Sequence, residues 1–175
     1  MTRLFASIFL FLFISACSGS QPAYETGNYD ETQFGDLSGD RFAPTVLVLG
    51  ANTTQLTAAV ISGDRDYLTL RVPAGTTLSS LVLTDYQSTD PRAFIAVQRG
   101  QSFSEPAEDA DPAALLGYSL FGDEQLNINL LTAMAEAEGV AGFTPPLTAG
   151  DYSFWVQQTS KLPTEYGFRF TLTAE

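Results

Sequence analysis

The chain of 175 residues contains no histidine and only one cysteine, Cys17. The absence of histidine excludes Ser-His-Asp and Cys-His nucleophile activation, histidine-ligated zinc and a histidine general base near neutral pH. A single cysteine cannot close a disulfide within the chain, so the fold must rest on its hydrophobic core. Carboxylates, tyrosines, hydroxyls and Lys161 remain for chemistry. We find no catalytic motif among them and expect no enzymatic activity.

Positive charge is also scarce. Eight lysines and arginines stand against 20 aspartates and glutamates, which gives a formal net charge of −12. Such a chain offers no basic patch for nucleic acid or for anionic lipid headgroups. The general interpretation of so acidic a surface is solubility, and the sharper one is cation binding.

Residues 1–16 are typical of a bacterial lipoprotein signal peptide. Arg3 supplies the positive charge, and residues 4–14 form an apolar run that is short for a membrane span. The run ends in Ile14-Ser15-Ala16-Cys17, which resembles the lipobox. The resemblance implies that Cys17 becomes the mature N-terminus and carries a thioether-linked diacylglycerol, usually with a further acyl chain on its amine. The alternative is an ordinary secretory signal in which Cys17 is incidental.

Lipidation would anchor the mature chain to a membrane. Each buried methylene contributes about 0.8 kcal/mol, so two or more acyl chains anchor stably where one does not. Ser18 follows the cysteine in place of an aspartate, a pattern that goes with outer-membrane sorting in enteric bacteria. We predict an exported protein at the outer membrane or cell surface, with a flexible polar tether over residues 17–40 and one domain over residues 41–175.

Short apolar or alternating runs separated by glycine and proline turns predict strands in this domain. The expected strands cover residues 46–49, 56–61, 67–72, 78–84 and 93–98. Residues 150–172 add two more, read as a hairpin whose polar connection contains Pro163. Tyr152, Phe154 and Val156 share one face of the first. The class predicted is an all-β, antiparallel, jelly-roll-like β-sandwich of about seven to nine strands.

Residues 100–146 interrupt this rhythm and are predicted to form an insertion. Leu126, Leu130 and Met134 form a helical stripe, although residues 126–130 also alternate as a strand would. We favour a short helix because Asp123 is a suitable N-cap and residues 133–138 have high helix propensity.

Two motifs resemble bacterial pre-peptidase C-terminal domains. The first is Gly63-Asp64-Arg65-Asp66-Tyr67 followed by Val72-Pro73-Ala74-Gly75-Thr76; the second is Leu147-Thr148-Ala149-Gly150-Asp151-Tyr152 with the strand at 166–172. The middle of the chain is similar to an uncharacterised subgroup of exported bacterial domains. The resemblance implies a jelly-roll-like sandwich that serves as an accessory module.

Three sets of side chains are candidate sites. Asp64 and Asp66 share one side of an extended segment and are candidate calcium ligands, with Asp36, Asp40 or the loop 85–90 as sources of further oxygen donors. Alternatively, both aspartates complete turn hydrogen bonds or pair with neighbouring arginines. Otherwise we expect no cofactor.

Trp155 lies on the opposite strand face from Phe154. It is either an exposed stacking platform for a sugar or peptide, or a core residue beneath the inserted helix. An acidic run in the insertion, made up of Glu105, Glu108, Asp109 and Asp111, is the only candidate for a carboxylate pair of glycosidase type. Solvated loop acids are the simpler interpretation.

These features favour a non-catalytic, lipid-anchored envelope module that binds a protein or glycan partner. The insertion at residues 100–146 and the loops at one end of the sandwich are its expected contact surfaces. A structural envelope lipoprotein with no small ligand is the first alternative, and a small carboxylate-dependent glycan-active enzyme is the second.

Overall fold

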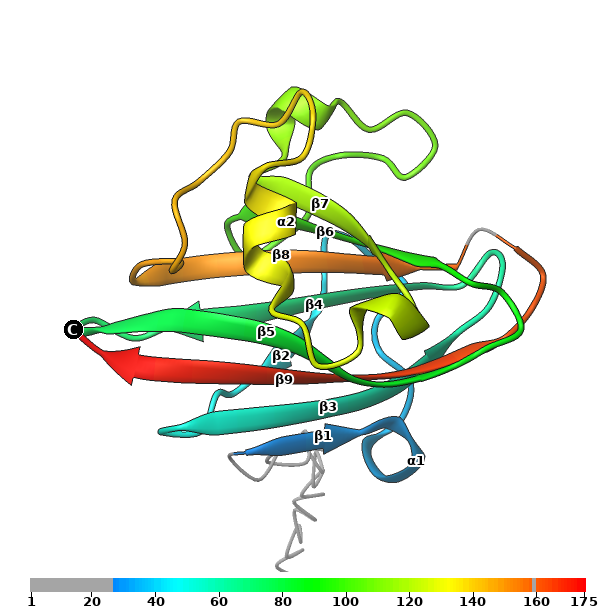
Figure 1. Ribbon diagram of the computed structural model, residues 1–175, viewed down its shortest axis with the longest axis horizontal. Coiled ribbons are helices and arrows are strands. Elements are labelled where there is room, and N and C mark those ends of the chain that lie inside the picture. Colours follow the sequence, from blue (N-terminus) through cyan, green and yellow to red (C-terminus); the bar gives the residue numbers. More distant parts are fainter. Residues whose placement is uncertain (1–26, 159) are drawn as a thin grey trace, which may run out of the picture.

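The computed structural model describes residues 27–158 and 160–175, so the signal peptide and Cys17 lie outside the described residues. Nine strands in the described part form two sheets, which pack face to face around a shared hydrophobic core (Figure 1). The predicted β-sandwich is therefore confirmed. None of the helices in the described ranges is long and apolar enough to cross a membrane.

The first sheet has four strands in the order β1-β3-β9-β5. They are β1 (Asn28–Asp30), β3 (Thr53–Val60), β9 (Thr164–Ala174) and β5 (Thr76–Gln87). β9 pairs antiparallel with both β3 and β5, and its Tyr166, Phe168 and Phe170 are buried in the core, as the alternation predicted. β1 is an addition at the edge, where it pairs parallel with β3.

The second sheet has five strands in the order β2-β4-β8-β6-β7. They are β2 (Thr45–Leu47), β4 (Arg65–Val72), β8 (Gly150–Gln157), β6 (Ala93–Arg99) and β7 (Gly117–Phe121). The pairs are antiparallel except at the edge, where β2 runs parallel to β4. Each sheet is thus mixed, with an antiparallel body and one parallel edge pair.

The hairpin predicted over residues 150–172 is wrong, although both of its strands exist. β8 pairs with β4 and β6 in the five-stranded sheet, whereas β9 pairs with β3 and β5 in the other. The polar connection therefore crosses from one sheet to the other. Alternation reports which face of a strand is buried, and it carries no information about the neighbouring strand.

The favoured helix is present as α2 (Leu130–Ala135), and its buried side chains are Leu130, Leu131 and Met134. Its N-cap is Asn129, whereas Asp123 begins the short 3-10 turn η2 (Asp123–Gln125). The Asn129 side chain accepts hydrogen bonds from the amides of Leu131 and, 3.0 Å away, Leu81 in β5. One side chain thus caps the helix and fixes it to the sheet edge, which local sequence does not indicate.

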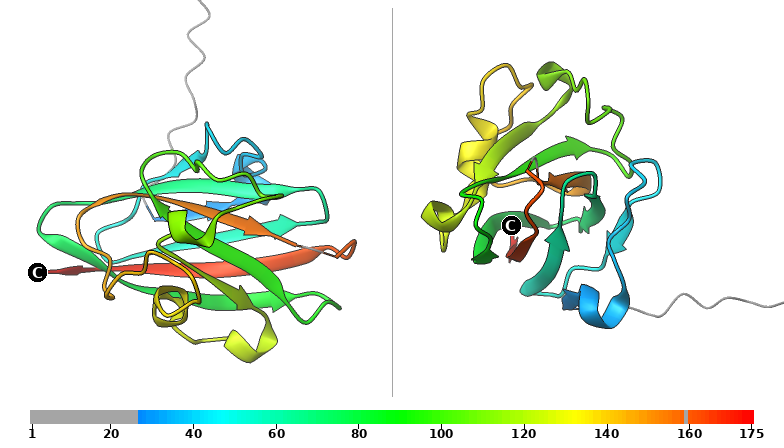
Figure 2. Two further views of the ribbon diagram at one scale, coloured as in Figure 1. Left: turned by 90° about the horizontal axis from the view of Figure 1, so that it is seen from above. Right: turned by 90° about the vertical axis from the view of Figure 1, so that its right-hand side faces the viewer.

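α2 closes the side of the sandwich between β5 and β7 (Figures 1 and 2). A Cβ atom at Gly117 would overlap the carbonyl of Met134, so a glycine is required for the helix to approach β7 this closely. Because β7 belongs to the five-stranded sheet, residues 100–146 are not wholly an insertion. The excursion outside the sheet is the segment 100–116, with the 3-10 turn η1 (Pro112–Ala114), followed after β7 by residues 122–149.

The predicted tether is also too long. Within residues 28–40 the chain forms β1 and the short helix α1 (Glu31–Phe34), and the side chains of Tyr29 and Leu37 are buried in the main core. The Tyr29 hydroxyl donates a hydrogen bond to the carbonyl of Gly35. Two apolar anchors and a sheet edge suffice to fix a segment whose average composition is polar, and a composition average hides such anchors.

Candidate functional site

The outer face of the five-stranded sheet has a covered half, centred on Trp155. This side chain is 2% exposed and packs against Phe94, Phe103 and Tyr67, with ring centroids 4.9, 5.7 and 6.3 Å away. Trp155 is therefore no exposed stacking platform. It is a core residue, as the alternative held, but its cover is the segment 100–116 and not the helix α2.

Two hydroxyl groups hold the start of this cover against the sheet. Ser153 Oγ donates to the carbonyl of Gly100 at 2.8 Å, and Thr69 Oγ1 donates to the carbonyl of Gln101 at 3.1 Å. The two hydroxyl oxygens are also within 2.9 Å of each other. Further on, the Phe103 amide donates to the carbonyl of Arg41. Gln101 lies at the margin of this cover, and on its side away from Trp155 the sheet face is open.

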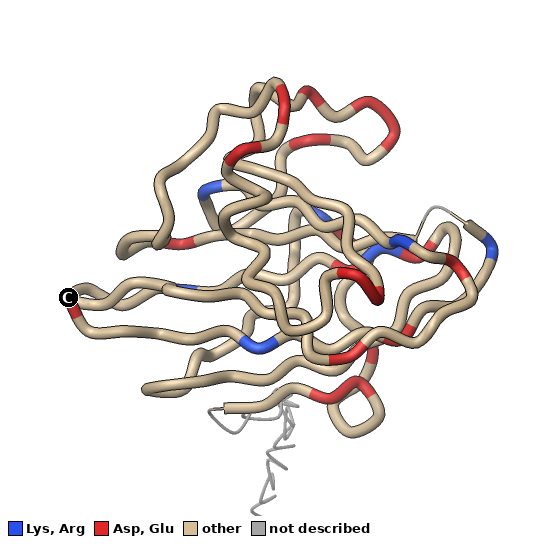
Figure 3. The backbone as a smooth tube through the Cα atoms, viewed as in Figure 1, with Lys and Arg blue, Asp and Glu red and all other residues tan. Residues whose placement is uncertain are grey.

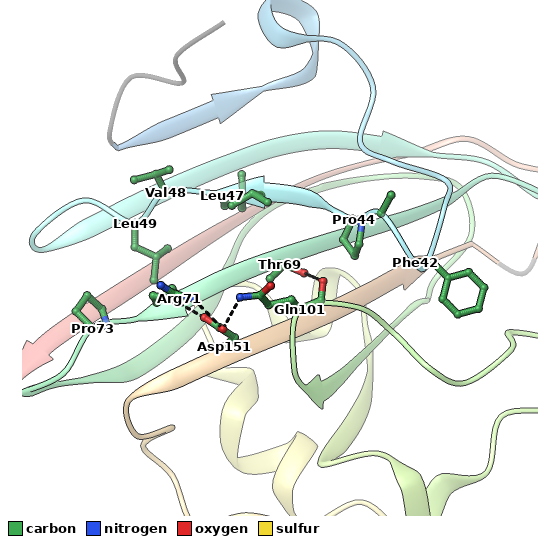
Figure 4. Close-up of a pocket in the computed structure, with 12 residues that line it drawn as sticks. Phe42, Pro44, Leu47, Val48, Leu49, Thr69, Arg71, Pro73, Gln101 and Asp151 are labelled. Carbon is green, nitrogen blue, oxygen red and sulfur yellow. Dashed lines mark hydrogen bonds and ion pairs between the residues drawn. The ribbon is translucent and has the colours of Figure 1, made fainter. Parts of the chain in front are cut away.

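The uncovered half forms a groove of about 600 Å³ between the segment 42–49 and the strands β4 and β8 (Figure 4). This volume lies within the ordinary range of ligand pockets. The groove is lined mainly by apolar side chains, and its residues are Phe42, Ala43, Pro44, Val46, Leu47, Val48, Leu49, Thr69, Arg71, Pro73, Gln101 and Asp151.

One wall of the groove exposes large apolar side chains. Phe42, Val46 and Val48 are 66%, 57% and 47% exposed. Val46 pairs in register with Thr69, which places its side chain on the outer face of the sheet, whereas Leu47 points into the core. Adjacent exposed apolar groups of this kind are typical of an interaction surface.

The floor of the groove is polar but internally neutralised. Arg71 donates from Nε and Nη2 to the two carboxylate oxygens of Asp151, at 2.6 and 3.0 Å, and Gln101 Nε2 donates to Asp151 Oδ2 at 2.8 Å. The hydrogen bond from Arg71, followed by that from Gln101, lowers the pKa of Asp151. The floor therefore carries ordered polar groups without a net charge.

A second constellation centres on Asp66, on the opposite face of β4. Its carboxyl group is fully buried, and Oδ2 accepts a hydrogen bond of 2.6 Å from the Tyr166 hydroxyl. Oδ1 has no hydrogen-bond partner in the described part of the chain. Burial is the main cause that raises the pKa of Asp66 to about 8; neighbouring carboxylates add to the rise, and the Tyr166 hydrogen bond opposes it.

Glu31 and Asp36 lie beside Asp66. One carboxylate oxygen from each of the three residues lies within 4.8 Å of the others. Glu31 is held in place because its Oε1 accepts the Leu37 amide and its Oε2 accepts the Ala59 amide. Burial also raises the pKa of Glu31. Three hard oxygen donors at this spacing suit a cation such as Ca²⁺, which binds oxygens at about 2.3–2.6 Å.

The structure thus places Glu31 and Asp36 beside Asp66, in place of the expected Asp64. Asp64 is not part of the three-oxygen group, although its charge contributes to the raised pKa of Asp66. Asp36 was expected as a further donor and is present in the group; Asp40 is not. Glu31 was missed, because its place beside Asp66 depends on the tertiary packing of the N-terminal segment.

Figure 3 colours the acidic residues of the chain red, and three of those in the covering segment make structural contacts. Glu108 forms an ion pair of 2.7 Å with Arg65, and the pKa of Glu108 is lowered by a backbone hydrogen bond and by this arginine. Glu105 accepts the Asp111 amide, and Asp111 accepts the Ala113 amide at the start of η1.

The groove itself was not predicted. The run 46–49 was identified as an apolar strand, but its position at the edge of the sheet was not. An apolar run has the same appearance in a buried strand and in a half-exposed edge strand, so the sequence holds no local signal for this site.

No protein-family model and no curated protein sequence matches the chain. Among solved structures, PliG from Aeromonas hydrophila, a periplasmic inhibitor of g-type lysozyme, is similar at 13% identity. The match covers 85% of this chain and 100% of that chain, with a TM-score of 0.40. A similarity at this level supports no transfer of function. The resemblance to pre-peptidase C-terminal domains stays a prediction.

Proposed function

We propose that the chain is a non-catalytic module of the cell envelope that binds a protein partner in the groove beside β2. The observation that carries this proposal is the exposed apolar wall, Phe42, Val46 and Val48, above a neutralised polar floor. Burying such a wall is favourable at roughly 25 cal/mol per Å². The ordered Arg71–Asp151 pair provides orientation without an uncompensated charge.

The chemistry of the groove favours a protein over a glycan. Sugars stack on exposed aromatic faces, but Trp155 and Tyr67 are both covered. The one aromatic side chain among the groove-lining residues, Phe42, has the Arg41 guanidinium against its ring. Valines, leucines and prolines line the groove instead, and such surfaces suit aliphatic side chains. The proposed contact surface is the groove, whereas the expected one was the insertion at residues 100–146. The apolar side chains of the segment 100–116 are buried against the sheet and are not available to a partner.

The predicted lipid on Cys17 completes the proposal. An exported chain acylated there would be held at the outer membrane or cell surface, where its partner is another envelope protein. Residues 28–40, which belonged to the predicted tether, are part of the folded domain.

A photo-crosslinking amino acid placed at Val46 of the full lipidated chain tests the proposal in native envelopes. We expect one enriched protein from this position. The matched control is Ile128, which is 50% exposed but lies at the opposite edge of the sandwich. Equal adducts from both positions would contradict the proposal. Capture from position 46 that Val48→Asp leaves unchanged would contradict it as well, because Val48 belongs to the same exposed wall.

We propose as a second function that Glu31, Asp36 and Asp66 bind a divalent cation, with Ca²⁺ the best match for three carboxylate oxygens. The specific observation in its favour is the buried Asp66 Oδ1, which lacks a partner among the described residues. A cation there would connect the N-terminal segment to β4 and replace the proton on Asp66.

Melting the protein in calcium and in EDTA tests this second function. Because the cation competes with a proton held up to about pH 8, we expect calcium to raise the melting midpoint more at alkaline than at acidic pH. Asp66→Asn and Asp36→Asn should abolish the rise, and Asp40→Asn should preserve it. An unchanged midpoint in the unsubstituted chain would refute the cation site.

A further inference from the structure

The segment 36–49 joins the two proposed sites in one continuous stretch of chain. Asp36, at its start, offers a carboxylate oxygen to the group formed with Glu31 and Asp66. Residues 42–49, at its end, form one wall of the groove. Both sites therefore take part of their structure from the same segment.

Ser38 carries the contacts between the two ends of this segment. Its carbonyl accepts the amide of Tyr67 in β4 at 2.8 Å, and its amide donates to Thr45 Oγ1 at 2.9 Å. Tyr67 directly follows Asp66 in the chain, and Thr45 is the first residue of β2, directly before Val46 of the groove wall. Ser38 is thus bonded both to the strand that carries a cation ligand and to the strand that forms the wall.

The carboxylate group lacks a positive partner of its own. Within the described part of the chain, no lysine or arginine pairs with Glu31, Asp36 or Asp66, and the buried Asp66 Oδ1 has no hydrogen-bond partner. Ionised carboxylates this close together repel one another. A divalent cation bound to all three would convert that repulsion into an attraction between the segment and β4.

The segment 36–49 is otherwise attached by few contacts. Its buried side chains are Leu37 and Leu47, and β2 is three residues long and has one partner strand. Elements of this kind open at a low cost in free energy. A ligand that binds only the attached arrangement shifts the opening equilibrium toward that arrangement. A cation is such a ligand, because Asp36 lies beside Asp66 only when the segment is attached.

We propose that the cation regulates the groove. By holding Asp36 beside Asp66 it keeps Ser38 in place, and Ser38 in turn keeps β2 in the position that forms the groove wall. Cation and partner then bind cooperatively, because both need the segment 36–49 attached. This inference rests on the two proposed functions and adds the link between them: binding of the envelope partner depends on the local calcium concentration.

Hydrogen exchange of the full chain in detergent, in calcium and in EDTA at one pH, tests the link. We expect calcium to slow exchange at the Ser38 and Tyr67 amides by about tenfold or more, because both hydrogen bonds break when the segment opens. The control is the Asn127 amide, which donates to the carbonyl of Leu83 on β5 at the opposite edge of the sandwich. Equal slowing at all three amides would indicate uniform stabilisation and would overturn the inference.

Thr45→Val separates the link from the two sites. It removes the acceptor of the Ser38 amide, but it keeps a β-branched residue in β2 and leaves all three cation ligands in place. Thr45→Ser keeps the acceptor and is the matched control. The measurement is the yield of the adduct from a photo-crosslinking residue at Val46, in detergent extracts of envelopes with calcium or EDTA.

In the unsubstituted chain and in Thr45→Ser, calcium should raise this adduct yield by about fivefold or more. In Thr45→Val the rise should fall below about twofold, while calcium still raises the melting midpoint. A calcium response of the adduct that Thr45→Val leaves intact would overturn the link through Ser38.

The proposals fail in different ways. If calcium leaves the melting midpoint unchanged, the cation site and this inference are refuted, and partner binding in the groove stands. If calcium raises the midpoint but changes neither the exchange at Ser38 and Tyr67 nor the adduct yield, the cation site stands and the link is wrong. Slowed exchange without a change in adduct yield also overturns the inference, because the ordering then stops short of the groove. If position 46 gives no specific adduct in either condition, partner binding and this inference are refuted together.

Discussion

Two surfaces lie side by side on the outer face of the five-stranded sheet, although the same strands, β4 and β8, supply both. Tyr67 and Trp155 form one and are buried beneath the segment 100–116. Thr69, Arg71 and Asp151 belong to the other, the open groove (Figure 4). The boundary is the Thr69–Ser153 hydroxyl pair, where the covering segment meets the sheet.

The comparison shows that strand pattern alone does not decide what an outward side chain does. At one end of β4 and β8, Tyr67 and Trp155 pack against the segment 100–116 and form a second small core with it. Charged residues at the other end pair with each other and leave two neighbouring valines exposed, Val46 in β2 and Val48 just after it. Two aspartates illustrate the difference: burial raises the pKa of Asp66, whereas the Arg71 hydrogen bond lowers that of Asp151.

The largest expected effect is the pH dependence of stability that the buried Asp66 causes. Asp66 holds its proton up to about pH 8 in the folded chain but only to its ordinary pKa of 3.8 when unfolded. The folded state therefore binds more protons in this window, and the free energy of unfolding falls as pH rises from about 4 to about 8. At 1.4 kcal/mol per unit of pKa difference, the loss reaches about 6 kcal/mol.

Asp66→Asn removes this titration and keeps an acceptor for the Tyr166 hydroxyl. Urea denaturation across the pH range should show a flatter curve than the unsubstituted chain, with the variant the more stable above about pH 8. Asp151→Asn is the control on the open half. If the free energy of unfolding depended on pH in the same way for Asp66→Asn and for the unsubstituted chain, the raised pKa of Asp66 would be contradicted.

Trp155→Ala should cost about 3–5 kcal/mol of unfolding free energy, because it leaves a cavity under the covering segment. Val46→Ala on the open half should cost about 0.5 kcal/mol or less. Trp155 is the only tryptophan in the chain, so its emission reports the covered half directly. A red-shifted emission quenched by acrylamide would show that the cover is not closed.

Ser153→Ala tests the boundary between the halves. It removes the hydrogen bond to Gly100 and one partner of Thr69, for an expected loss of about 1–2 kcal/mol. Hydrogen exchange should then increase at the Phe103 amide, which the covering segment holds against Arg41. Unchanged exchange at Phe103 would mean that the aromatic contacts alone hold the cover.

The smallest effect is expected for Arg71→Gln. The Arg71–Asp151 pair is solvent-accessible, and such pairs contribute about 0–1 kcal/mol. A double-mutant cycle with Asp151→Asn measures the coupling. A coupling well above 1 kcal/mol would show that the floor of the groove is a structural element rather than an adaptable contact surface.

Much of the fold was accessible from the sequence, because strand identity is a local property. The alternation at Tyr152–Phe154–Val156 and at Tyr166–Phe168–Phe170 predicted buried faces correctly. Pairing was not accessible: β8 and β9 separate into different sheets, β7 was absorbed into a predicted insertion, and β1 was hidden in a polar segment. Such pairings depend on long-range contacts whose energies no local window contains.

By itself, the sequence determined the β-sandwich class, the absence of histidine chemistry, the acidic balance and the inward rows of the long strands. These follow from composition and from the period of two that every strand imposes on its side chains. Only the tertiary structure decided that Trp155 is covered, that Val46 is exposed, and that Glu31 and Asp36 join Asp66. Those outcomes depend on which distant segments lie against β4 and β8, and burial is a property of that packing.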